Sequence, residues 1–155
     1  MRLRFLCQHH RALLERSATR ARGTWIMSYD KALAFSAEDR LEQAINAAGS
    51  ALEAAEILIR DHAQQGEVDL RRFTESAILL RALLLELGDA GLVSGLVGGC
   101  MARLDWAMAS GAPRPAVLQC CQRLLEAGAP SVHSELAPRA AAVVPQRYSG
   151  SSALH

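Results

Sequence analysis

Apolar residues recur at intervals of three and four along most of this chain, which is the spacing of one face of an α-helix. One such run extends from Leu41 to Leu58, with alanine at most of its inner positions. A second run begins at Leu70 and reaches Leu87, with further leucines on its other sides. A helix that is apolar nearly all round lies at the centre of a core or is shared with another subunit. The pattern predicts a succession of helices, in which the helix at residues 70–87 is either central to the core or shared with another subunit.

Turn signals divide this pattern into about six helices arranged as antiparallel hairpins. The expected helices cover about residues 3–20, 24–35, 40–61, 70–87, 90–109 and 115–127. Gly23 is expected to end the first helix and Thr24 to cap the second, while Gly88 and Asp89 separate the fourth from the fifth. Residues 129–155 lack sustained periodicity and predict a flexible, disordered tail. One helical domain at 1–128 and a tail at 129–155 are therefore expected.

Composition strengthens the helical prediction and narrows the chemistry. Ala and Leu dominate the apolar residues and only 5% of the 155 residues are aromatic, so strand formers are few. The cysteines, Cys7, Cys100, Cys120 and Cys121, show no Cys-x-x-Cys pairing. We expect an all-α protein with reduced cysteines, no metal and no cofactor, located in the bacterial cytoplasm.

The run Gly91–Gly99 (GLVSGLVGG) places four glycines within the fifth predicted helix. A phosphate-binding loop would need a preceding strand and a Gly-Lys-Ser/Thr ending, and neither is present. On a helix these glycines cluster along one side. We therefore expect a close helix crossing, against residues 70–87 or a second subunit, and a loss of stability or oligomerisation in Gly95→Leu. The uncharged run 90–102 is too short to span a bilayer, which takes about 20 residues.

Catalysis is not expected. The acidic side chains are scattered, and Glu53 and Glu56 lie one turn apart among alanines, on what the pattern predicts to be a solvated face. No local Ser-His-Asp or Cys-His arrangement suggests a nucleophile. We expect neither an enzyme nor catalytic residues.

The predicted hairpin at residues 25–58 carries small and aromatic residues at fixed offsets. These are Ala32, Phe35, Ala44, Ala48 and Ala51. In this order and spacing they resemble about one tetratricopeptide repeat. The hairpin departs from that pattern at two positions, where Ser28 and Glu56 replace the repeat's tryptophan and proline.

The resemblance implies a helical-repeat bundle that binds a protein or peptide on the face formed by the first helix of each hairpin. Ile26, Tyr29 and Leu33 would face that groove, and Arg11 would lie among the arginines at its rim. We expect a non-enzymatic interaction module, such as an adaptor, a chaperone-like protein of the small secretion-chaperone type, or a regulator. A homodimer through residues 70–108 is a further expectation.

The alternative is a regulator that binds nucleic acid or an anionic surface through the Arg-rich N-terminal helix. Residues 1–22 hold six arginines against the single acid Glu15. The formal net charge of the whole chain is only +1, so nucleic acid is not the favoured partner.

Overall fold

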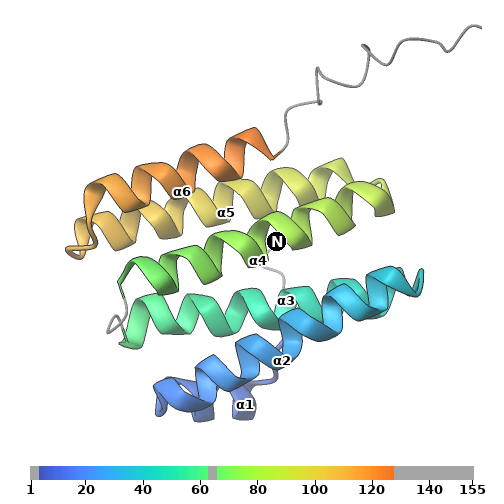
Figure 1. Ribbon diagram of the computed structural model, residues 1–155, viewed down its shortest axis with the longest axis horizontal. Coiled ribbons are helices and arrows are strands. Elements are labelled where there is room, and N and C mark those ends of the chain that lie inside the picture. The colour runs from blue at the N-terminus through green and yellow to red at the C-terminus, as the bar shows by residue number, and fades with distance from the viewer. Residues whose placement is uncertain (1–3, 63–65, 128–155) are drawn as a thin grey trace, which may run out of the picture.

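Six α-helices follow one another in the computed structural model, which describes residues 4–62 and 66–127. They are α1 (Gln8–Glu15), α2 (Ala18–Ala37), α3 (Leu41–Ile57), α4 (Glu67–Leu87), α5 (Ala90–Ala109) and α6 (Arg114–Glu126), with a π-helical segment, η1 (Leu58–His62), after α3. No strand occurs in these two ranges, so the all-α prediction is confirmed. Figure 1 shows the long helices α2 to α6 side by side and alternating in direction. The predicted tail at 129–155 lies outside the described residues.

The first helical break lies at Ser17, and the predicted break at Gly23 is wrong. The Ser17 hydroxyl accepts a hydrogen bond from the Arg20 N–H at 3.3 Å, which caps the first turn of α2. Gly23 and Thr24 lie inside α2. A side-chain cap satisfies one of the N–H groups that a helix N-terminus leaves unpaired, whereas an interior glycine only weakens a helix.

The predicted break between the fourth and fifth helices is confirmed. Gly88 ends α4 with φ +82°, a left-handed conformation that glycine adopts without strain. The Asp89 carboxylate then accepts the Leu92 N–H at 2.9 Å and caps α5. Helix α5 covers the predicted residues 90–109.

Helix α4 is the central element, which is one of the two alternatives that its all-round apolar pattern left open. It packs against α3, α5 and α6 and touches α2. Phe73, Leu80 and Leu84 on α4 are almost completely buried in the main core. A second, smaller cluster joins α1, α2, α3 and η1 through Leu14, Ala21, Ala54, Ile57 and Leu58.

Helices α2 and α3 form the closest hairpin in the described part of the chain. Ala32, Ala44, Ala48 and Ala51 have no exposed surface. Small side chains at these positions let the two backbones approach, because interhelix distance depends on the side chains at the contact. The structure thus supports packing between adjacent helices at the positions where the repeat resemblance was seen.

Helices α3 and α5 both pack on α4 but hardly touch each other. This separation leaves space between them along one side of α4, and that space is the candidate site. Among the described residues, no helix combines the length and the apolar character needed to cross a membrane.

Candidate binding groove

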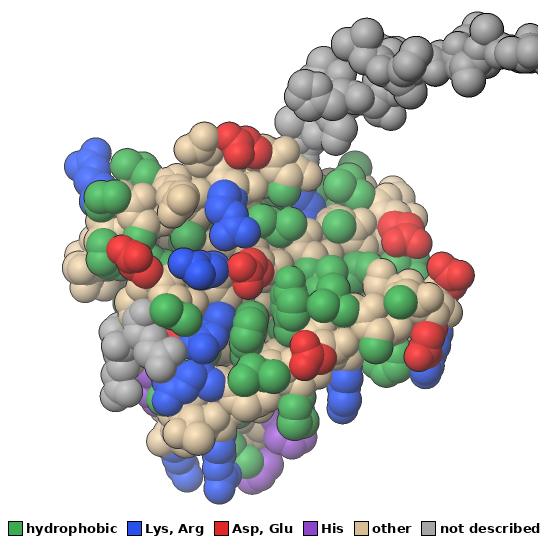
Figure 2. Space-filling view, viewed as in Figure 1, with side chains coloured by type: hydrophobic (Ala, Val, Ile, Leu, Met, Phe, Trp, Pro, Cys, Tyr) green, Lys and Arg blue, Asp and Glu red, His purple; other side chains and the backbone are tan. Residues whose placement is uncertain are grey.

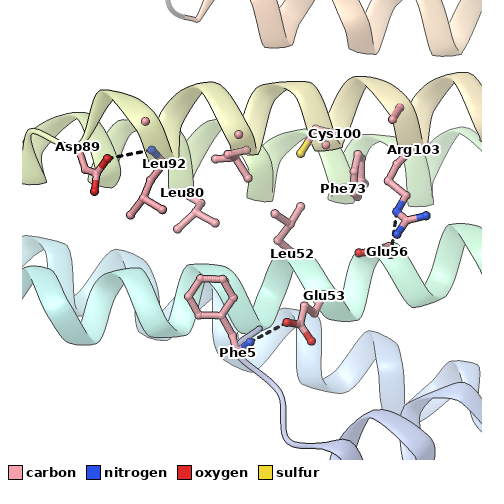
Figure 3. Close-up of a pocket in the computed structure, with 16 residues that line it drawn as sticks. Phe5, Leu52, Glu53, Glu56, Phe73, Leu80, Asp89, Leu92, Cys100 and Arg103 are labelled. Carbon is pink, nitrogen blue, oxygen red and sulfur yellow. Dashed lines mark hydrogen bonds and ion pairs between the residues drawn. The ribbon is translucent and has the colours of Figure 1, made fainter. Parts of the chain in front are cut away.

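A groove of about 760 Å³ lies between α3 and α5, with α4 as its floor (Figure 3). Phe73 and Leu80 from α4 line the floor, Leu52 lines the α3 wall, and Leu96 and Cys100 line the α5 wall. All five side chains are largely or fully buried members of the main core. The groove therefore exposes an edge of the core between two helices that make few contacts with each other.

The glycines of α5 form an open wall of this groove. Gly91, Gly95 and Gly99 line it, one helical turn apart. Apart from the adjacent backbone of α5 itself, a Cβ atom built on Gly95 or Gly99 would meet no described atom within 4 Å, and one on Gly91 would meet only the Asp89 carboxylate. The prediction that these glycines pack against the fourth helix is wrong, because α5 faces the core with its larger side chains, among them Val93 and Leu104.

Phe5 lies against the opposite wall, where α3 also carries a glycine. A Cβ on Gly49 would overlap the Phe5 ring, so the ring packs directly on the backbone of α3. The Phe5 N–H donates to Glu53 Oε1 at 2.6 Å. The segment 4–7 is not helical, although the sequence predicted a helix there. The Glu53 carboxylate accepts the Phe5 N–H where this N-terminal segment enters the groove. This hydrogen bond replaces the backbone hydrogen bond that a helix would supply.

Two arginines and two glutamates form an ion-pair network at the end of the groove opposite Asp89. Arg103 Nε lies 2.9 Å from Glu56 Oε1 and links α5 to α3 (Figure 3). Arg11 reaches from α1 to Glu53 at 3.2 Å and to Glu56 at 3.8 Å. The prediction of a solvated face for Glu53 is wrong, since this residue is only 6% exposed. A buried carboxylate is tolerated because it is paired and hydrogen-bonded.

The cysteine in the groove has little nucleophilic character. Burial, followed by the negative charge of Glu56, raises the pKa of the Cys100 thiol to about 12. The thiol therefore stays protonated at neutral pH, and a thiolate is the reactive form. Elsewhere, Cys7 Sγ and His10 Nδ1 lie 3.2 Å apart on the surface. Within the described ranges no three His, Cys, Asp or Glu residues converge as metal ligands.

The residues predicted to bind a partner fall on two separate surfaces. Ile26 and Leu33 are 48% and 47% exposed on α2, and neither lines the groove between α3 and α5. Tyr29 is half-buried and stacks on Trp25, with ring centroids 5.3 Å apart. Burial, and then the charge of Glu75, raises the pKa of Tyr29. Arg11 alone reaches the groove, through its pairs with Glu53 and Glu56 described above.

Figure 2 shows how charge is distributed on one face of the molecule. Lys, Arg, Asp and Glu side chains are intermingled with apolar ones over much of this face. Basic side chains and histidines project from the edge formed by α1 and α2. This face therefore carries both signs of charge.

Comparison with protein-family models, with curated proteins and with solved structures finds no match to this chain. The glycine wall of the groove was visible in the sequence as a periodic cluster, although the pattern could not say whether a helix of this chain covers it. No sequence pattern assigned Phe5, Leu52 and Phe73 to a common binding site, because only the fold brings them together.

Proposed function

We propose that this protein is a non-enzymatic interaction module, an adaptor, chaperone-like protein or regulator, which binds an apolar helical segment of a partner protein in the groove between α3 and α5. The observation that carries the proposal is the open wall of α5 at Gly91, Gly95 and Gly99, beside buried core side chains. A helix interior that tolerates such glycines loses up to about 1 kcal/mol at each relative to alanine. Close approach of a partner's backbone compensates this cost.

The length of the groove along α5 suits a helical guest. Its lining on α5 extends from Asp89 to Arg103, and a rise of 1.5 Å per residue makes this about 21 Å. That length corresponds to about four turns of helix. A guest helix would lie on α4 between α3 and α5, at the spacing of about 8–10 Å that is usual between packed helices. Helix-in-groove binding of this kind depends on apolar residues at i, i+3, i+4 and i+7 of the partner.

The polar groups of the groove support binding rather than chemistry. Glu53 and Glu56 are held by Arg11 and Arg103. The Asp89 carboxylate is committed to capping α5. A general acid or base needs a group that is free to exchange protons with a substrate. Glu56 instead joins the two walls of the groove through its ion pair with Arg103 of α5.

A selection of helical peptides, with matched glycine variants, tests the proposal without a known partner. Peptides would be selected from a displayed library on the full-length protein and then titrated against Gly95→Leu and Gly98→Leu. Both glycines are exposed on α5 with open space around them, but only Gly95 lines the groove. We expect amphipathic peptides whose affinity falls at least about tenfold in Gly95→Leu and stays unchanged in Gly98→Leu.

Other outcomes would assign the binding surface elsewhere. Peptides that bind both glycine variants equally, but weaken in Leu33→Ala, would place recognition on the exposed face of α2 that carries Ile26 and Leu33. A library that yields no binder, together with tight binding of anionic polymers, would favour the alternative of an anionic partner. Either result contradicts the groove proposal.

A further inference from the structure

We propose that Phe5 is a resident competitor in the groove, and that the partner's anchoring residue is an aromatic side chain that displaces Phe5 and packs on Gly49. This inference rests on the proposed function, because it specifies what the partner of that groove carries. It follows from the way the chain already fills one part of the groove with its own ring.

The backbone of α3 at Gly49 offers a flat surface, here called the seat, that suits an aromatic ring. It is buried in the interior of α3, where glycine is a poor choice for helix stability. Its missing side chain leaves room for the Phe5 ring against the α3 backbone, since a Cβ there would overlap the ring. Aromatic side chains bury a large flat surface at a small entropic cost, so a ring uses such a seat well.

Phe5 is held in a way that permits exchange. It belongs to the non-helical segment 4–7, its side chain is only half-buried, and its N–H donates to Glu53 Oε1. Glu53 also pairs with Arg11 at 3.2 Å. When Phe5 leaves, the buried carboxylate therefore keeps a charged partner, which avoids the large cost of an unpaired buried charge.

Exchange of one ring for another thus preserves most of the native contacts. The incoming aromatic side chain regains the apolar burial that Phe5 gives up, and an N–H or other donor of the partner beside it can satisfy Glu53 Oε1. An aliphatic or alanine side chain at the same position would leave part of the seat empty and lose packing. The partner's chemistry is therefore an amphipathic helix with an aromatic anchor.

The test titrates the groove-binding peptides against full-length wild type, Phe5→Ala and Gly49→Ala by fluorescence anisotropy. Phe5→Ala should bind about tenfold more tightly than wild type, because the partner no longer displaces a packed ring. Gly49→Ala should bind about tenfold more weakly, because its Cβ occupies the seat. Phe35→Ala, which removes another half-buried phenylalanine away from the groove lining, should match wild type. Replacing the peptide's aromatic residue by alanine should abolish the gain seen in Phe5→Ala.

A second probe keeps the inference testable if the selection fails. N-acetyl-phenylalanine methylamide, added to full-length Phe5→Ala, should shift the amide NMR signals around Gly49, whereas N-acetyl-alanine methylamide should not. The absence of such shifts would overturn the aromatic seat. Peptides that weaken in Gly95→Leu but bind Phe5→Ala and wild type equally would also overturn it, while leaving the proposed function intact.

Discussion

Gly23 and Gly49 are both interior helix glycines, but their surroundings differ. A Cβ at Gly23 would meet no described atom within 4 Å, whereas one at Gly49 would overlap the Phe5 ring. Replacing glycine by alanine in a helix gains about 0.5–1 kcal/mol when the new methyl group fits. The consequence of the same substitution therefore depends on what lies over the backbone.

We predict that Gly23→Ala raises the free energy of unfolding by about 0.5–1 kcal/mol. Gly49→Ala should show no such gain, because expelling Phe5 loses part of its burial, about 1–2 kcal/mol for a half-buried side chain. Urea denaturation of the two variants and wild type measures the difference. Equal stabilisation by both substitutions would show that the Phe5 ring contributes nothing at Gly49.

Cys100 gives a prediction about thiol reactivity. Its pKa is raised to about 12, chiefly by burial, and a raised pKa favours the neutral thiol. At pH 8 it should hold about a thousandfold less thiolate than an ordinary cysteine of pKa about 9. Timed alkylation followed by mass spectrometry should therefore modify the exposed Cys7 first and Cys100 far more slowly, with the Cys100 rate rising as the pH approaches 12. Equal rates at pH 8 would contradict the burial of Cys100.

Single residues were predicted well where one local interaction decides their role. Gly88 and Asp89 end one helix and begin the next through backbone conformation and a side-chain cap, both of which local sequence encodes. Glu53 was misjudged because its burial depends on Arg11, 42 residues away. Neighbouring alanines gave no sign of that arginine. A buried ion pair can be recognised only when the positions of both partners in the fold are known.

At the scale of elements, the Asp89 cap supports a helix, α5, that begins with weak helix formers. Its first two turns contain Gly91 and Gly95, which have low helix propensity. The Asp89 carboxylate accepts a hydrogen bond from the Leu92 N–H at 2.9 Å. Its negative charge also stabilises α5 by interacting with the positive end of the helix dipole. The same turns form part of the groove wall, so loss of the cap disturbs the site as well as the helix.

We predict that Asp89→Ala lowers the free energy of unfolding by about 1 kcal/mol and speeds amide hydrogen exchange in residues 92–96. Asp89→Asn should remain close to wild type, because asparagine is an equally good cap. Ser17→Ala should cost a similar amount while leaving exchange in α5 unchanged, since Ser17 caps α2. Unchanged exchange in α5 of Asp89→Ala would show that core packing alone holds its first turns.

Element boundaries were predicted best where apolar periodicity and caps agree. Helix α5 has the predicted bounds, whereas the first break was placed at Gly23 instead of Ser17. The error arose because glycine signals a helix end only when the chain needs a left-handed conformation, and Gly23 stays helical. The π-helical turn η1 was not predicted. It places the successive residues Leu58 and Ile59 in different hydrophobic clusters. This arrangement depends on the tertiary packing, which apolar periodicity does not predict.

At the scale of the whole molecule, the groove exists because α3 and α5 both pack on α4 and make few contacts with each other. Periodicity gave a central position as one of two alternatives for α4, but it could not state which neighbours of α4 touch each other. The exposed arginines Arg4, Arg16 and Arg20 lie on the N-terminal part of the chain, and Arg11 is engaged by carboxylates. The groove and the N-terminal edge that carries these exposed arginines, here called the basic edge, are therefore separate surfaces. Binding at the two surfaces would have different physical driving forces.

Because of these driving forces, binding in the groove should depend little on salt, whereas binding at the basic edge should weaken steeply as salt rises. Peptide binding in the groove buries apolar surface, so we predict that its Kd changes by less than about threefold between 0.1 and 0.5 M NaCl. A nucleic acid held by four phosphate contacts would lose about 300-fold in affinity over the same range. Isothermal titration at several salt concentrations, with the selected peptides and with a DNA duplex, separates the two. A steep loss for peptides that also weaken in Gly95→Leu would mean that charged contacts, rather than the apolar floor formed by Phe73 and Leu80, supply most of the affinity in the groove.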